Sequence, residues 1–197
     1  MRTFWVFFSF LLVNISFAQG KSFKDSTEEY FKKYVKEHEV VTGKDKDLMS
    51  FFPVDEKYRI TCKFERMLNS QWFRMESSGQ VKRNYRTYGI IYFKINDTAV
   101  TLNIYQSQDL MTSPQYKDHL FIPFTDATSG EETYESGRYI DLEIKDITND
   151  RVLIDFNKAY NPYCAYVSGK YNCPIPPKEN NLNVAILAGE KNYGKKH

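Results

Sequence analysis

Histidine and cysteine are scarce in this sequence, and their spacing does not match a metal-binding motif. The chain of 197 residues has three of each, with no C-x-x-C pair and no closely spaced pair of histidines. Structural zinc sites usually need four such ligands, supplied in close pairs. The pattern therefore gives no positive sign of a metal centre, and we expect no cofactor.

Long apolar runs are also missing, except at the start of the chain. There Arg2 precedes an apolar run, Phe4–Val13, which is too short for a membrane span, and small residues follow it. This pattern is typical of a secretory signal peptide. We therefore expect a signal peptide at residues 1–19, an exported periplasmic or secreted protein at residues 20–197, and no membrane span after cleavage.

Neither sign of charge dominates the sequence. Removing Arg2 with the predicted signal peptide leaves 26 basic residues against 25 acidic ones. Proteins that bind nucleic acid show a strong basic bias on one face. We therefore expect no nucleic-acid partner. The remaining residues show no internal repeat and no low-complexity tract, and their number suits a single domain with its own core.

Aromatic residues are abundant, with 15 tyrosines and 15 phenylalanines, which favours β-strands around a well-filled core. One segment nevertheless has helical spacing. Residues 25–38 begin with Asp25 or Ser26 as the expected cap and continue with larger side chains on one stripe. The stripe consists of Tyr30, Phe31, Tyr34, Val35 and His38.

From Tyr58 onward the spacing changes to a period of two, which is typical of half-buried strands. The alternation places Cys62 on the inner face, where we interpret it as a small buried side chain. Further strands are predicted at 71–76, 81–95, 99–107, 119–124, 137–144, 151–156 and 182–187, with tight turns at 77–79, 96–97 and 148–150. We therefore expect one mainly β domain, an antiparallel β-barrel or β-sandwich with one N-terminal α-helix.

Arg138 is unusual because it falls on the apolar face of its predicted strand, with Ile140 and Leu142. A guanidinium that points toward a core needs a carboxylate, since an unpaired buried charge is very costly. Asp126 and Asp155 are the candidate partners. The pair either fixes the local fold or presents Arg138 as an anion-binding group at the mouth of a barrel.

The stretch "DATSG" at 126–130 has the composition of a turn that caps its own backbone. The alternative is a hydrolase site in which Ser129 is the nucleophile, His119 the base and Asp126 the orienting carboxylate. The spacing of these residues does not by itself require such a triad.

Cys164 and Cys173 have eight residues between them and lie between Pro162 and Pro174, in a stretch that cannot be a regular helix or strand. In an exported protein a disulfide is the expected state. A metal or redox module built on the two thiols remains the alternative.

Four stretches carry a resemblance to a known family: "PFTDATSGEETYESGRYIDL", "DFNKAYNPYCAY", "CPIPPKENNL" and "AGEKNY". Together they resemble the signature blocks of the domain of unknown function 1684 family, in a short, exported form, and the resemblance extends over about Phe51 to Tyr193. The family has no established activity. The resemblance implies that relatives lack a histidine at position 119, which weakens the triad, and that many relatives are cytoplasmic, which weakens a family-wide disulfide.

These observations lead to one functional hypothesis and two alternatives. We expect an exported domain that binds a small-molecule or peptide ligand at one end of the barrel, near Arg138, where residues 156–177 and the turn at 125–138 form the walls. The alternatives are the hydrolase and the cysteine-based module. The expected ligand-binding residues are Asp126, Tyr134, Arg138, Asn157, Asn161 and Tyr163.

Overall fold

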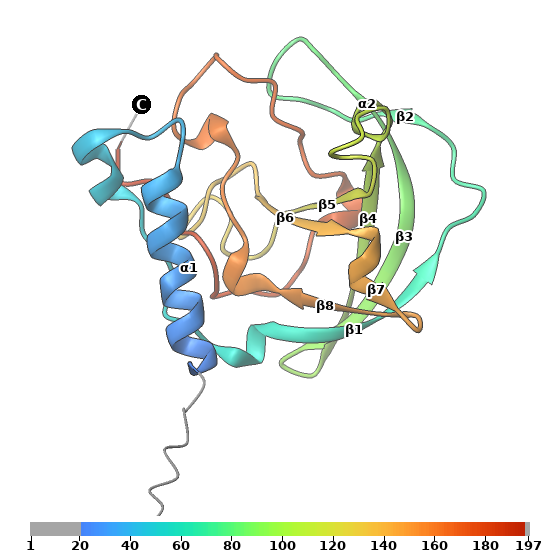
Figure 1. Ribbon diagram of the computed structural model, residues 1–197, viewed down its shortest axis with the longest axis horizontal. Helices are drawn as coiled ribbons and strands as arrows, with labels where there is room; N and C mark the ends of the chain where they lie inside the picture. The colour runs from blue at the N-terminus through green and yellow to red at the C-terminus, as the bar shows by residue number, and fades with distance from the viewer. Residues whose placement is uncertain (1–20, 196–197) are drawn as a thin grey trace, which may run out of the picture.

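The computed structural model describes residues 21–195 (Figure 1), and the predicted signal peptide lies outside them. In the described part the α-helices are α1 (Phe23–Glu37) and the single turn α2 (Gln108–Met111). The strands are β1 (Arg59–Arg66), β2 (Phe73–Arg74), β3 (Asn84–Ile95), β4 (Thr98–Ser107), β5 (His119–Phe124), β6 (Arg138–Glu143), β7 (Ile147–Thr148) and β8 (Arg151–Asp155). Short 3-10 turns lie at Gly43–Leu48, Glu56–Tyr58, Ile144–Asp146, Phe156–Lys158, Tyr163–Ala165 and Lys178–Asn180.

All eight strands belong to one antiparallel sheet, in the order β6-β5-β4-β3-β1-β8-β7, with β2 added beside β3. The sheet curves into an open half-barrel (Figure 1). It does not close, because β6 exchanges backbone hydrogen bonds with Tyr160, in the irregular chain after β8, in place of a pairing with another strand. The mainly β, antiparallel prediction is confirmed, whereas the closed barrel and the two-sheet sandwich are wrong.

The predicted turns at 96–97 and 148–150 are confirmed. Asn96 and Asp97 both have positive φ, of 46° and 65°, and Asn149 and Asp150 repeat this with 51° and 54°. Two consecutive residues with positive φ form the tight turn that matches the twist of an antiparallel hairpin. The turn predicted at 77–79 is wrong, since residues 75–83 form a long connection between β2 and β3.

The predicted strand at 182–187 is also wrong. This segment runs beside residues 125–127, where Leu182 N–H donates to the carbonyl of Thr125 and Ala127 N–H donates to the carbonyl of Val184. It crosses the open side of the sheet and buries Ile186 and Ala188 in the main core. Its alternating pattern therefore reflects burial on one side, with a short parallel contact to residues 125–127 in place of a strand of the sheet. The predicted strand at 71–76 is reduced to β2, and the other strands agree within three residues.

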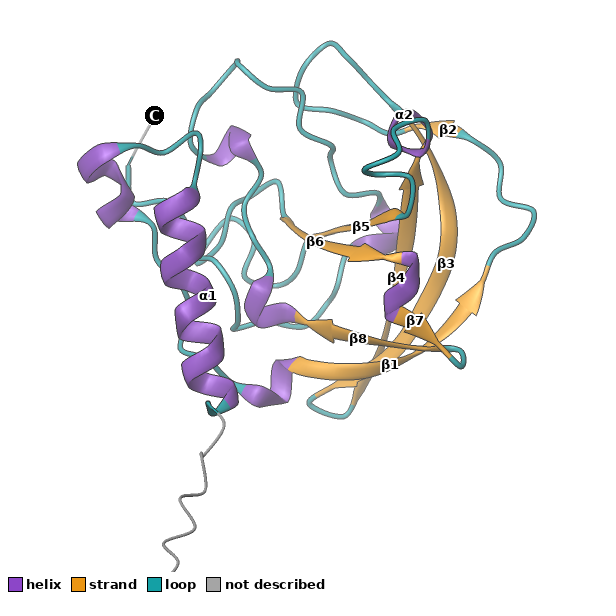
Figure 2. Cartoon of the chain, viewed as in Figure 1, coloured by secondary structure: helices purple, strands orange, loops and turns teal. Residues whose placement is uncertain are grey.

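The helix α1 lies across the open side of the half-barrel, opposite β3 and β4 (Figures 1 and 2). It begins earlier than predicted, because Ser22 is the cap and its Oγ accepts from Asp25 N–H at 3.1 Å. The predicted stripe faces the protein: the rings of Phe31 and Phe51 stack at 4.2 Å, and Tyr34 packs beside a small cluster around Tyr166. No helix within residues 21–195 is long and apolar enough to cross a membrane.

Candidate ligand-binding cavity

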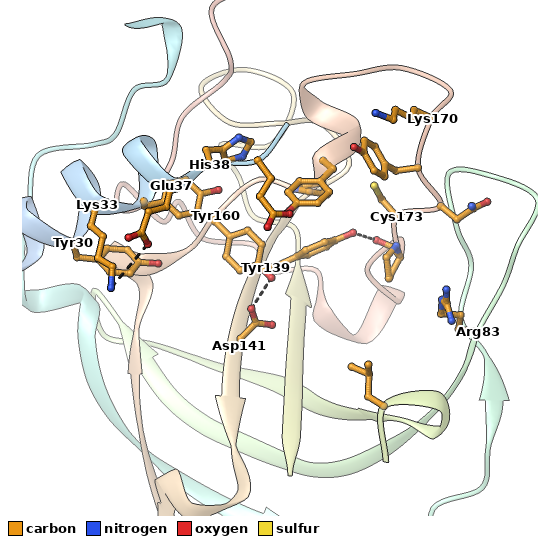
Figure 3. A pocket seen from close by; sticks show the side chains of 18 residues that line it. Tyr30, Lys33, Glu37, His38, Arg83, Tyr139, Asp141, Tyr160, Lys170 and Cys173 are labelled. Atoms are coloured by element: carbon orange, nitrogen blue, oxygen red, sulfur yellow. Dashed lines mark hydrogen bonds and ion pairs between the residues drawn. The ribbon is translucent and has the colours of Figure 1, made fainter. Parts of the chain in front are cut away.

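A cavity of about 1100 Å³ lies between α1, the edge strand β6 and the irregular segment 160–174 (Figure 3). Its walls come from parts of the chain that are far apart in sequence. Arg83 and Leu110 also line it. Six of the 18 residues that line it are tyrosines. The tyrosines are Tyr30, Tyr34, Tyr139, Tyr160, Tyr163 and Tyr171.

Hydrogen bonds fix the tyrosines at the base of the cavity. Tyr139 Oη donates to the carbonyl of Pro174, and Tyr160 Oη donates to Asp141 Oδ2 at 2.7 Å (Figure 3). The other oxygen of Asp141 lies 3.0 Å from Nε2 of His119. Burial raises the pKa of Tyr139 and Tyr160 well above the usual value. Both phenols are therefore neutral at physiological pH. The two hydrogen bonds hold their rings in fixed positions.

The wall on the α1 side rests on a buried carboxylic acid. Glu190 accepts from Tyr166 Oη at 2.6 Å, from Tyr34 Oη at 3.3 Å and from the N–H of Asn161 at 2.9 Å. Burial raises the pKa of Glu190 to about 7, although these donors and nearby Arg138 act in the opposite direction. Tyr34 therefore connects the cavity to a group that is close to titration at neutral pH.

His38 closes the same wall and is buried. Its Nδ1 accepts from the N–H of Val41 at 2.9 Å, and its ring meets Tyr166 edge-on at 4.6 Å. Burial lowers the pKa of His38, and Lys46 adds to this effect. Since Nδ1 acts as an acceptor, the ring is neutral here. His38 was predicted on the helical stripe of residues 25–38, and it caps the C-terminal end of α1.

Charged side chains of both signs surround the cavity, and most of them are paired. Lys33 lies 4.0 Å from Glu37 on α1, and Arg83 lies 2.7 Å from Asp109. Glu39 accepts a hydrogen bond from Tyr163 Oη at 3.4 Å. The arrangement presents no field of one sign and so suits a ligand that is neutral or carries balanced charges.

Arg138 lies outside this cavity and is completely buried, with 0% of its surface exposed. The predicted ion pair is confirmed: Nη2 lies 2.8 Å from Asp126 Oδ2. The guanidinium also donates to the carbonyls of Ile186, Ala188 and Glu190. It thereby joins the turn after β5 to the C-terminal segment, which is the role of a structural ion pair.

The other residues expected at the ligand site are mostly structural as well. Asn157 is buried and holds residue 55, accepting from the N–H of Asp55 and donating to its carbonyl, both at 3.0 Å. Asn161 is buried and donates to the carbonyl of Lys191 at 2.8 Å. Tyr134 is half-buried and lies outside the cavity lining, whereas Tyr163 lines it. Within the predicted set, only Tyr163 reaches the cavity.

The residues of the hydrolase alternative are not brought together as a triad. Ser129 Oγ accepts from the N–H of Asp126 at 3.1 Å, as expected for a turn that caps its own backbone. His119 lies at the start of β5 and contacts Asp141. Within residues 21–195, no hydrogen bond joins Ser129 to a histidine.

Cys164 and Cys173 form a disulfide, with Cα atoms 6.3 Å apart, and Cys173 lines the cavity. Close to them in sequence, Tyr163 and Tyr171 pack their rings with centroids 5.1 Å apart. The third cysteine, Cys62, is free and buried in the core, and burial raises the pKa of its thiol to about 12. No group of three or more histidine, cysteine, aspartate or glutamate side chains within residues 21–195 is placed to hold a metal ion.

The expectation about the irregular segment was half right. It does form a wall of a cavity, but the opposite wall is α1, since the turn at 125–138 is turned inward by Arg138 and by the C-terminal segment. The sequence indicated the base of the cavity only weakly. Tyr139 and Asp141 alternate with the apolar residues of β6 and therefore share its other face.

The fold and the cavity define a β-rich domain in which an antiparallel half-barrel is covered by one helix and a long C-terminal segment. The family model described as "Protein of unknown function (DUF1684)" matches residues 46–191, and the chain belongs to this family. The solution NMR structure of an uncharacterised protein of Haloarcula marismortui is similar to it, with a TM-score of 0.62 and 27% sequence identity, over 85% of this chain and 97% of that chain. No curated protein matches the sequence.

Proposed function

We propose that the protein is an exported domain that binds a small-molecule or peptide ligand in the tyrosine-lined cavity. One observation carries the proposal: six tyrosines from three separate parts of the chain line one cavity of about 1100 Å³. Ligand sites are typically concave, lined by apolar and aromatic groups with a few fixed polar groups, and of several hundred cubic ångströms. Tyrosine supplies a large apolar face and a polar tip, which suits recognition.

The rigidity of the walls supports this proposal. The disulfide closes the tip of the irregular segment, and the hydrogen bonds of Tyr139 and Tyr160 hold the floor. A preformed site loses little entropy when a ligand binds. Export is supported by the predicted signal peptide and by the disulfide, since disulfides persist in oxidising compartments.

The test is a ligand screen with two matched variants. A library of small molecules and short blocked peptides is screened against the protein by saturation-transfer NMR. Glu37→Trp places a bulky side chain at the cavity. Lys36→Trp changes the preceding residue of α1, which does not line the cavity. We expect the screen to find ligands that bind the unchanged protein and the Lys36→Trp variant but do not bind the Glu37→Trp variant. The proposal fails if nothing in the library binds, or if both variants bind as the unchanged protein does.

A further inference from the structure

The edge of the sheet at β6 has backbone groups that the protein leaves unpaired. On one side, β6 pairs with β5 along its whole length. On the other side, the N–H and C=O of Tyr160 exchange hydrogen bonds of 3.0 and 2.9 Å with Tyr139, and the N–H of Glu143 donates to Asp146 Oδ2 at 2.8 Å. β6 is therefore an edge strand over the rest of its length.

The alternation of an antiparallel ladder shows which groups are free. Residues of β6 that bond to β5 alternate with residues that turn their N–H and C=O away from it. Tyr139 belongs to the second kind, since it bonds to Tyr160 and faces Pro123, which has no N–H. Asp141, two residues on, then also turns its N–H and C=O outward. No backbone hydrogen bond from another part of the described chain reaches Asp141.

These free groups lie where two hollows meet. The tyrosine-lined cavity is on one side, and a smaller hollow of about 290 Å³, between β6 and β8, is on the other. Both are lined by Tyr30, Asp141 and Tyr160. Asp141 therefore lies at the boundary of two hollows that follow one another along the edge of the sheet.

We infer that the cavity takes an extended peptide segment, which adds to the edge of β6 through the backbone of Asp141. This inference rests on the proposed function and narrows it to one class of ligand. In strand addition, main-chain hydrogen bonds supply affinity and pockets for alternate side chains supply specificity. The backbone of Asp141 offers one donor and one acceptor to such a segment, and the tyrosines accept every second side chain as an apolar or aromatic group.

The shape of the site favours a peptide over a compact small molecule. An extended chain advances about 3.3 Å per residue, so a few residues are enough to pass from the tyrosine-lined cavity along the edge into the smaller hollow. A compact ligand would fill the larger cavity alone and leave the smaller hollow between β6 and β8 empty. The balanced charges around the site also suit the neutral backbone of a peptide.

The first test separates the backbone of Asp141 from its side chain. Asp141→Pro and Asp141→Ala both remove the contacts to His119 and Tyr160, but only the proline also removes the N–H. Proline is tolerated on an edge strand where the N–H points away from the sheet. The probe is a pool of acetylated, amidated heptapeptides, randomised over all residues except cysteine, and the tightest binder is measured against both variants by calorimetry.

We expect Asp141→Pro to bind this peptide about tenfold more weakly than Asp141→Ala, as the loss of one backbone hydrogen bond implies. We also expect N-methylation of one backbone position of the peptide to remove binding. Equal affinity of the two variants would overturn the inference.

The second test needs no substitution and therefore stands even if Asp141→Pro does not fold. In the free protein the N–H of Asp141 should exchange with solvent quickly, while those of Ile140 and Leu142 are protected, and the peptide should slow exchange at Asp141 by at least about tenfold. Protection of Asp141 in the free protein would contradict the inference. If small molecules bind and respond to Glu37→Trp while no heptapeptide binds, the proposed function stands and the peptide inference fails.

Discussion

Arg138 and Asp126 show how a buried ion pair can hold distant parts of a fold together. The guanidinium is fully buried, and its partners are the carboxylate of Asp126 and three carbonyls of the C-terminal segment. If the guanidinium of Arg138 were removed, each of these acceptors would lose its hydrogen-bond donor, and Asp126 would lose the positive charge beside it. Removing one member of such a pair is costly because the other stays buried and unpaired.

We therefore predict that Arg138→Ala lowers the free energy of unfolding by about 3–5 kcal/mol. Arg151→Ala is the matched control, since Arg151 is exposed on β8 and forms no ion pair in the described residues, and it should change stability by less than about 0.5 kcal/mol. Urea denaturation followed by circular dichroism measures both values. Equal effects of the two substitutions would show that Arg138 is not a structural centre.

Glu190 leads to a prediction about pH. Its pKa is raised to about 7 in the folded protein, from an ordinary value of 4.5, because burial disfavours the charged form. The folded state therefore binds more protons than the unfolded state between these two values. The protonated Glu190 therefore contributes to the free energy of unfolding. This contribution is fully present below about pH 4.5 and is lost as the pH rises through 7, by roughly 3 kcal/mol in all.

Glu190→Gln tests the assignment, because glutamine keeps an acceptor for Tyr166 but does not titrate. The stability of the unchanged protein, measured by urea denaturation at pH 5 and pH 8, should fall more with rising pH than that of the variant. The same pH dependence in both proteins would mean that another group is responsible.

At the scale of elements, the segment after β8 shows how an irregular stretch is kept in place. The disulfide between Cys164 and Cys173 closes its tip, and Ser78 ties it to the loop before β3, accepting from the N–H of Cys173 at 3.0 Å. Proline residues limit its freedom in the unfolded state. A stapled segment of this kind can serve as a fixed wall although no strand pairing supports most of it.

Removing the staple should loosen that wall. We predict that Cys164→Ser combined with Cys173→Ser lowers stability by about 2–3 kcal/mol, as expected for closing a short loop, and speeds hydrogen exchange in residues 163–173. Cys62→Ala should cause only a packing defect in the core. Alkylation of the unfolded, non-reduced protein followed by mass spectrometry should label Cys62 alone. Labelling of all three cysteines would disprove the link.

The elements that the sequence predicted well are those in which local chemistry decides the structure. The Asn-Asp turns at 96–97 and 149–150 need residues that accept positive φ, and the strands between them alternate cleanly. Residues 182–187 alternate in the same way but contact a loop, and only the tertiary structure shows this. Arg138 was correctly expected to be buried, yet burial alone could not show where the cavity lies.

At the scale of the whole molecule, the site arises because the sheet stays open. β6 meets Tyr160 in place of a closing strand, and α1 covers the remaining side. The cavity lies between these parts, which are distant in sequence, so no local pattern could predict it. The helix and the irregular segment were each predicted from the sequence. That they line the same cavity depends on their positions relative to the half-barrel.

Ligand binding in the tyrosine-lined cavity is tested most directly by mapping the binding site on the folded protein. Amide correlation spectra are recorded while the strongest ligand from the screen is added to isotope-labelled protein. We predict that the largest shifts fall on Asp141, Tyr160 and Cys173, which line the tyrosine-lined cavity. Shifts that gather instead around Phe73 and Ile175, which line a separate hollow of about 580 Å³, would contradict it.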